Sequence, residues 1–199
     1  MKAEEATEFM DVDKPNNRFK QRAAIFISFL AMLLAITGLG GQNANKETLN
    51  NNIQAANAFN FYQAKNIRQT SLILAVDEIE LAWAATPGLS DEARAALGKK
   101  LETYKANIAR YESEPSTGEG KKELMARARA HEEARDRAMK QDPYFDYAEA
   151  LLQIAIVLIS VSLVAEIIWL AFLGGGLGLI GALLMINGFT LWVAVPGLS

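Results

Sequence analysis

The chain alternates between long apolar segments and a long polar segment, and this pattern predicts three membrane-spanning helices. Residues 23–41 contain no charged side chain in nineteen positions, and residues 150–198 contain one charge, Glu166, in forty-nine. A helix rises about 1.5 Å per residue, so roughly 20 apolar residues cross a hydrocarbon core about 30 Å thick. The first segment is therefore long enough for one span, and the second is long enough for two.

The first apolar segment is interpreted as a retained membrane anchor. A signal peptide also places cations before an apolar run, but its apolar core has about 7 to 15 residues and ends at a small-residue cleavage site. Residues 23–41 exceed that length, and no clean A-x-A site follows them. Cleavage of this segment remains the alternative.

The cations that flank the first span predict its orientation. Four of them precede the span: Lys14, Arg18, Lys20 and Arg22. Only Lys46 lies close behind it. Because cytoplasmic loops carry an excess of Lys and Arg, we expect residues 1–22 to form a cytoplasmic polar tail. Residues 42–148 would then lie on the outer side of a multi-pass membrane protein, which is the periplasmic side if the membrane is the inner membrane of a Gram-negative bacterium.

Two positions compete for the turn between the second and third spans. A break at the triple glycine, residues 174–176, would bury Glu166 inside the second span at a cost of a few kcal/mol. A turn near Ala165-Glu166 instead leaves the carboxylate at the headgroups as an interfacial acid, and we favour it. The resulting spans cover residues 144–165 and 167–189, followed by a C-terminal tail over residues 190–199.

Aromatic residues near the ends of these spans predict contacts with lipid headgroups, where Tyr and Trp are enriched. Tyr144, Phe145 and Tyr147 lie at the outer end of the second span. Trp169 lies at the inner end of the third span. We expect both groups to face the membrane interfaces.

The polar segment over residues 42–148 has helical signals throughout and no alternation typical of strands. The predicted helices cover residues 43–86, 90–113 and 121–141. Pro87-Gly88 stops the first helix, Ser90 is the N-cap of the second, and Asp142-Pro143 interrupts the third. The fold class is therefore an all-α membrane protein with three transmembrane helices and a long, coiled-coil-like extramembrane insert between the first and second.

The first helix of the insert carries an unusual run of amides, with nine Asn and Gln residues in the twenty-one positions of Asn50–Thr70. Every heptad register that we considered places some of these amides at the contact positions of a helix–helix seam. One register is Leu49, Ile53, Ala56, Asn60, Gln63, Ile67, Thr70 and Leu74, and another is Ala55, Phe59, Tyr62, Asn66, Gln69 and Ile73. Polar residues in a seam reduce stability but set register and copy number. An exposed polar face that meets only water is the open alternative.

A second heptad-like stripe lies in the next helix, at Leu97, Leu101, Tyr104 and Ile108. Helices this long and thin bury little surface alone, so we predict homo-oligomerisation. The candidate residues for contacts with another copy or with a partner are Ile53, Asn60, Tyr62, Gln63, Ile67, Leu97, Leu101, Tyr104 and Ile108.

The residues that could carry chemistry form no pattern typical of an enzyme. GLGLIG, residues 176–181, matches G-x-G-x-x-G but lies in an apolar span without the acidic residue that the dinucleotide fingerprint needs. Close helix packing through Gly174 and Gly178, at G-x-x-x-G spacing, is the preferred interpretation. His131 has neither a second His four residues later nor a Glu three residues earlier, so a metal site is not indicated.

The composition argues against two further classes of function, cysteine-based chemistry and nucleic-acid binding. The chain has no cysteine, which excludes disulfides and thiolate chemistry. Residues 42–148 carry 15 Lys and Arg against 16 Asp and Glu, so no basic excess indicates nucleic acid. We therefore expect no catalytic activity, no cofactor, no metal and no nucleic-acid partner.

The run NNIQAANAFNFYQAKNIRQT, which follows one span and precedes a long helical insert, resembles the bacterial membrane family known as domain of unknown function 4337. The C-terminal stretch YAEALLQIAIVLISVSLVAEIIWLAFLGGGLGLIGALLMINGF matches the same pattern. The most specific parts are Tyr62-Gln63-Ala64-Lys65 and Gln153-Ile154-Ala155. The resemblance implies three spans, the last two in a tight hairpin. Family members often carry a basic or Gly-containing turn there, whereas this chain has Ala165-Glu166, and the family name implies no activity.

The leading functional hypothesis is a non-enzymatic, homo-oligomeric integral membrane protein. It would act in the lipid bilayer as a scaffold or as an accessory subunit of a larger membrane complex. The alternative is a pore or transport component lined by Asn and Gln side chains. The spans offer little polar lining beyond Ser28, Thr37, Gln153, Ser160 and Ser162, which counts against a pore.

Overall fold

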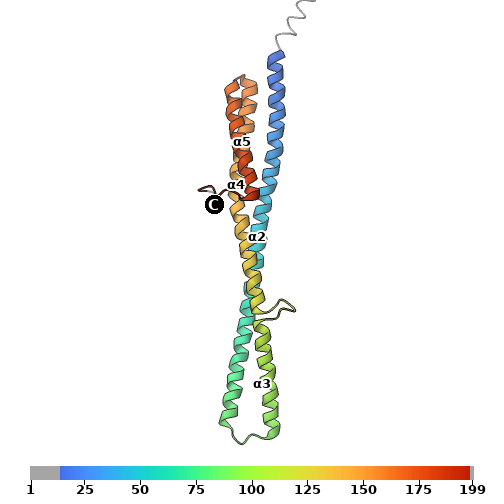
Figure 1. Ribbon diagram of the computed structural model, residues 1–199, viewed down its shortest axis with the longest axis vertical. Helices are drawn as coiled ribbons and strands as arrows, with labels where there is room; N and C mark the ends of the chain where they lie inside the picture. The colour runs from blue at the N-terminus through green and yellow to red at the C-terminus, as the bar shows by residue number, and fades with distance from the viewer. Residues whose placement is uncertain (1–13, 198–199) are drawn as a thin grey trace, which may run out of the picture. The chain divides into compact units, whose positions relative to one another are not determined.

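The computed structural model describes residues 14–197, and in this range the secondary structure consists of four helices and no strand. The helices are α2 (Lys14–Ala85), α3 (Asp91–Glu112), α4 (Lys121–Ala165) and α5 (Ile168–Thr190), drawn in Figure 1. The expected all-α fold is confirmed. Residues 1–13 of the predicted polar tail, the side chain of Lys14, and the last two residues of the C-terminal tail lie outside the described part.

Three of the four helices, α2, α4 and α5, are long and apolar enough to cross a membrane by length and composition. This agrees with the expected number of spans and indicates membrane association. The chain turns between α4 and α5 at Glu166 and Ile167, the position that the sequence favours. The triple glycine at residues 174–176 lies inside α5 and does not break it.

Two helices continue past positions where a change was predicted. α2 contains both the predicted first span and the first helix of the insert, and it passes through Gly40 and Gly41. α4 passes through Pro143, so the predicted helix end at Asp142-Pro143 is wrong. A proline inside a helix removes one hydrogen bond and costs roughly 3 kcal/mol. The next two residues, Tyr144 and Phe145, are almost fully buried, and their packing offsets that cost.

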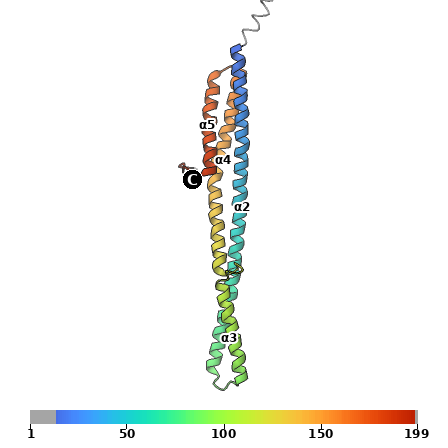
Figure 2. The same cartoon turned by 45° about the vertical axis from the view of Figure 1, so that its right-hand side comes forward.

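The described chain divides into two compact units. Unit 1 contains the residues up to Glu47 and those from Asp136 onward, and unit 2 contains Thr48–Arg135. In unit 1, the first part of α2 and the second part of α4 lie beside α5, as both views show (Figures 1 and 2). All three candidate spans therefore contribute to one packed unit.

The helices of unit 1 bury one narrow face each, at heptad spacing. On α4 the fully buried positions in the apolar part are Ala148, Leu152, Ala155, Ile159 and Ser162. On α5 they are Gly174, Gly178, Gly181, Met185 and Gly188. The 4-3-4-3 spacing keeps both faces in register, and small residues let helix backbones approach closely. Ala23 and Leu30 of α2 complete the core.

The glycines of α5 are required by this close approach. A Cβ atom added at Gly174 would lie 2.8 Å from Ile159 Cγ1 and 2.9 Å from the carbonyl oxygen of Ala155. At Gly178 it would lie 2.9 Å from Leu30 Cδ2 on α2. The two glycines predicted to mediate helix packing therefore contact both neighbouring helices.

Phe145 of α4 is held between glycines of two other helices. A Cβ atom would lie 2.6 Å from its Cε1 atom if added at Gly40 of α2, and 2.9 Å if added at Gly188 of α5. The Phe189 ring stands edge-on to the Phe145 ring, with centroids 4.8 Å apart. The glycines that weaken α2 as a helix thus create the space that Phe145 fills.

Tyr144 anchors the chain that follows α5. Its hydroxyl donates a hydrogen bond to the Val193 carbonyl oxygen at 3.2 Å and accepts one from the Val195 amide at 3.0 Å. The expectation that Tyr144 and Phe145 face headgroups is therefore wrong, because both pack inside unit 1. Tyr147 and Trp169 are more than half exposed and stay available for that role.

We predict opposite effects for two alanine substitutions in α5. Gly174→Ala should destabilise unit 1 by about 1 to 3 kcal/mol, because the added methyl meets the α4 backbone. Gly176→Ala, two residues away, should stabilise it by up to about 1 kcal/mol, because nothing lies within 4 Å of the new methyl. Thermal unfolding in detergent, followed by circular dichroism, measures both. Equal midpoints for the two variants would contradict the packing described.

Candidate functional site

The part of α2 that lies in unit 2 has an inner face packed within the chain. Its positions are buried or half-buried and recur at alternating spacings of three and four: Thr48, Asn51, Ala55, Ala58, Tyr62, Lys65, Gln69, Leu72, Val76, Ile79 and Trp83. We call these residues the inner stripe. The second predicted register shares Ala55, Tyr62 and Gln69 with this stripe, but its Asn66 and Ile73 are exposed, and Lys65 was not among the predicted contacts. The uninterrupted three-four spacing of Ala55, Ala58 and Tyr62 was the available signal.

The opposite face carries the first register considered from the sequence. We call it the outer stripe: Leu49, Ile53, Ala56, Asn60, Gln63, Ile67, Thr70 and Leu74, all of them exposed. Leu49, Ile53, Ile67 and Leu74 are between 57% and 66% exposed. Large apolar side chains thus recur at heptad spacing on a face that the chain itself leaves uncovered.

The amides of α2 divide between these two faces. On the inner stripe, Gln69 Nε2 donates to the Ile108 carbonyl oxygen at 3.0 Å and to Glu112 Oε2 at 3.2 Å. Its Oε1 atom accepts from Lys121 Nζ at 2.7 Å. Asn51 Oδ1 lies 2.9 Å from Nδ1 of His131. The inner amides therefore join α2 to α3 and α4, which explains why this helix accepts them.

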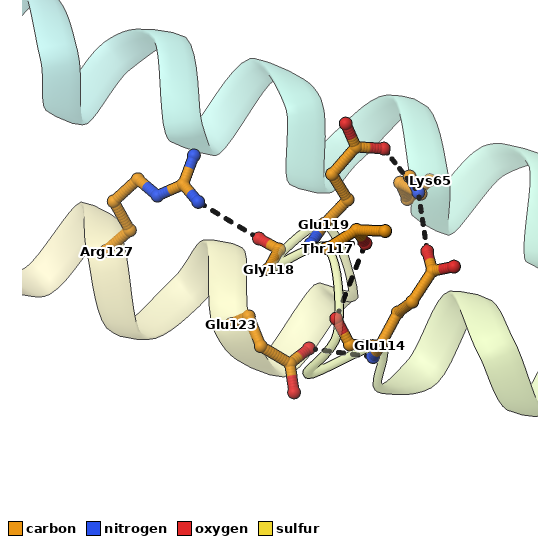
Figure 3. A network of polar contacts seen from close by, with 7 residues as sticks. All are labelled: Lys65, Glu114, Thr117, Gly118, Glu119, Glu123 and Arg127. Atoms are coloured by element: carbon orange, nitrogen blue, oxygen red, sulfur yellow. Dashed lines mark hydrogen bonds and ion pairs between the residues drawn. The ribbon is translucent and has the colours of Figure 1, made fainter.

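Lys65 is the one charged residue of the inner stripe, and only 9% of its surface is exposed. Its ammonium lies 3.5 Å from a Glu119 carboxylate oxygen and 3.9 Å from one of Glu114, as Figure 3 shows. It also lies 5.3 Å from the centre of the Tyr111 ring. A buried ammonium is costly unless it is paired, and these partners offset the cost of its desolvation.

The loop between α3 and α4 is held closed by hydrogen bonds with side chains of α4. The Glu123 carboxylate accepts from Ser113 Oγ at 2.6 Å and from the Glu114 amide at 3.1 Å. Arg127 donates to the Gly118 carbonyl oxygen at 3.1 Å (Figure 3). Gly118 has φ +68°, a left-handed conformation that side chains disfavour. We call this loop, with Lys65, Gln69, Glu112 and Lys121, the polar junction.

The predicted stripe of α3 is half-buried at each of its four positions, Leu97, Leu101, Tyr104 and Ile108. α3 runs antiparallel to α2: Lys105 Nζ lies 2.7 Å from Glu80 Oε1, and Gly98 faces the Trp83 ring. The chain itself thus covers part of the α3 stripe. The outer stripe of α2 is the more exposed of the two candidate contact surfaces.

The remaining predicted site residue, Glu166, lies at the turn between α4 and α5. It has φ +57°, and its carboxylate lies 3.3 Å from Lys20 Nζ on α2. Both side chains are about half exposed, so this ion pair contributes at most about 1 kcal/mol. The pair brings the cationic start of α2 and the α4–α5 turn to the same end of unit 1.

The described residues hold no group of three or more His, Asp or Glu side chains placed to bind a metal ion. His131 is hydrogen-bonded to Asn51, and the acidic residues of the polar junction are paired with Lys65 and Lys121.

A family model for a domain of unknown function, DUF4337, matches residues 19–191. This match covers most of the chain, and the chain belongs to that family. No curated protein and no solved structure matches it.

We predict that Glu112 contributes to acid sensitivity. Hydrogen bonds from Gln69 and Lys121 lower the pKa of its carboxyl below the usual 4.5. A carboxyl with a lowered folded-state pKa stabilises the fold above the unfolded value, and this contribution is lost as the pH falls through the lowered value. The thermal midpoint of the native chain should therefore fall between about pH 5 and 3.

In the same titration Glu112→Gln should lower the midpoint at pH 7 and reduce its change between neutral and acidic pH. Glu102→Gln is the matched control, because Glu102 is exposed on α3 and its side chain makes no hydrogen bond or ion pair within the described chain. Parallel curves for the native chain and Glu112→Gln would contradict the role assigned to Glu112.

Proposed function

We propose that this member of the DUF4337 family is a non-enzymatic membrane scaffold whose copies assemble through the outer stripe of α2. The observation that carries the proposal is the exposure of Leu49, Ile53, Ile67 and Leu74 at heptad spacing. Large apolar side chains in water at this spacing are the contact positions of a helical seam. Covering them would bury apolar surface that the monomer leaves in water.

The chemistry of the stripe favours a second copy of the same chain as the occupant. None of its eight residues is charged. A neutral amide carries both a donor and an acceptor, so Asn60 and Gln63 can each pair with the same residue of another copy. Copies anchored in one membrane point the same way, which brings equal positions of the stripe to equal heights in a parallel coiled coil.

The proposal places the scaffold in the bacterial inner membrane. The spans would be residues 23–41, 144–165 and 167–189, and residues 42–148 would lie on the periplasmic side. The cations before the first span support this orientation. The ion pair between Lys20 and Glu166 is consistent with it, because a cytoplasmic N-terminus requires the α4–α5 turn on the cytoplasmic side as well.

An accessory role in a larger membrane complex is compatible with the same surface. The outer stripe would then serve self-association, while the partner complex would bind elsewhere on the chain. Purification from native membranes in mild detergent tests this part, since an accessory subunit retains a partner at fixed stoichiometry.

The polar residues of the spans favour a scaffold over a pore. The hydroxyls of Ser28, Thr37 and Ser160 donate to carbonyl oxygens of their own helix four residues earlier, at 2.8 to 3.0 Å. Ser162 donates to the Ile167 carbonyl oxygen at 2.9 Å. Hydroxyl donors engaged in this way leave little lining for a hydrated path across unit 1.

We predict site-specific cross-linking along the outer stripe. The chain has no cysteine, so a single one can be introduced without removing others. Ile67→Cys should form disulfide-linked dimers in native membranes under mild oxidation, because equal positions meet in a parallel pair. Arg68→Cys is the control, because its side chain is also exposed but points about 100° around the helix. Equal dimer yields from the two variants on non-reducing gels would exclude the outer stripe as the seam.

We predict that the outer amides control copy number. Exchanging Asn60 and Gln63 together for Leu should strengthen association while producing a mixture of oligomers, because polar seam residues specify register at a cost in stability. Native mass spectrometry from membranes reads the distribution. An unchanged single copy number would contradict this role. Ion flux in proteoliposomes that the double variant abolishes would instead support the pore.

A further inference from the structure

Unit 2 contains an open pocket beside the polar junction, on the side of α4 that carries Lys122 and Arg129. It encloses about 340 Å³, within the range typical of pockets for small ligands. Its walls come from three helices: Tyr62 of α2, Glu112 at the end of α3, and Lys121, Lys122, Met125, Ala126 and Arg129 of α4.

The pocket has an excess of positive charge. Three cations line it against one carboxylate, that of Glu112. Lys121 already uses this carboxylate, because its ammonium lies 3.2 Å from Glu112 Oε2 and 2.7 Å from Gln69 Oε1. The side chains of Lys122 and Arg129 make no hydrogen bond or ion pair within the described part of the chain. Within the described residues these two cations therefore form no ion pair, although the charge of Lys122 helps to lower the pKa of Glu112 and of Glu123.

The other walls are suited to an apolar group that carries an anion. Met125 and Ala126 of α4 contribute apolar surface, and Tyr62 contributes the ring that Lys121 approaches at 5.6 Å. The Tyr62 hydroxyl makes no hydrogen bond within residues 18–197. The pocket thus combines free donors, unpaired cations and an aromatic face.

The acidic wall residue, Glu112, offsets only one of the three positive charges. Hydrogen bonds from Gln69 and Lys121, aided by the charge of Lys122, lower the pKa of Glu112. The carboxylate binds Gln69 and Lys121 inside the chain. Lys122 and Arg129 can therefore bind an external anion. A guanidinium and an ammonium together offer several donors to phosphate or carboxylate oxygens.

We propose that this pocket binds a small organic anion with a phosphate or carboxylate head and an apolar, ring-like body. Arg129 and Lys122 hold the anionic head, and Tyr62 with Met125 contacts the body. This site is separate from the outer stripe, so the inference goes beyond the scaffold role and does not depend on it.

Phenyl phosphate is the probe, because it joins a phosphate to an aromatic ring. The full chain in nanodiscs of zwitterionic phosphatidylcholine should bind it with a Kd in the millimolar range or below, read by saturation-transfer NMR. Phenol, which lacks the anion, should not bind. Rising salt should weaken binding of the phosphate, since the site is exposed.

The decisive variant combines Lys122→Gln and Arg129→Gln, two exposed positions whose exchange leaves the packed faces intact. It should weaken phenyl phosphate binding at least about tenfold. The matched control combines Lys99→Gln and Arg68→Gln, which remove the same charges from exposed positions outside the pocket. Its affinity should equal that of the native chain. No binding at about 10 mM, equal binding of phenol, or equal losses in the two double variants would overturn the proposal.

Discussion

The fold of unit 1 depends on the distance at which helix backbones can approach. Lipid tails are as apolar as leucine, so helices in a membrane associate through close packing more than through burial from water. Four of the five buried positions of α5 are glycines. At Gly174 and Gly181 the neighbouring atoms include carbonyl oxygens of α4, at 2.9 Å and 3.2 Å from an added Cβ atom, so a side chain would crowd the α4 backbone. The path of α5 along α4 therefore follows from these missing side chains.

In unit 2, polar contacts hold the helices in one packing arrangement. Its inner stripe has small residues at Ala55 and Ala58, and it places Lys65 and Gln69 where the loop between α3 and α4 closes on α2. Buried ion pairs contribute little net stability compared with apolar packing, but an unpaired buried charge is costly. The polar junction thus penalises alternative registers of the three helices of unit 2.

The count of spans and the turn at Glu166 could be predicted, because apolar length and one charge determine them. The burial of Phe145 could not be predicted, because it depends on Gly40 and Gly188, which are distant in sequence. The inner stripe was predicted only in part for a related reason. Gln69 has partners 39 and 52 residues away, so its place in a heptad register predicts a contact but does not identify the residues that it binds.

The amide-rich run of α2 contains two groups of residues, one bonded inside unit 2 and one exposed, and the sequence alone does not distinguish them. Asn51 and Gln69 have partners inside unit 2, so the fold accounts for them. Asn60 and Gln63 are exposed, and their side chains make no hydrogen bond within the described residues. Solubility alone would accept Lys or Glu at such positions, yet the outer stripe is uncharged over eight residues and holds four large apolar side chains. An uncharged surface that exposes leucine and isoleucine is typical of an interaction site, which supports the proposed contact with another copy.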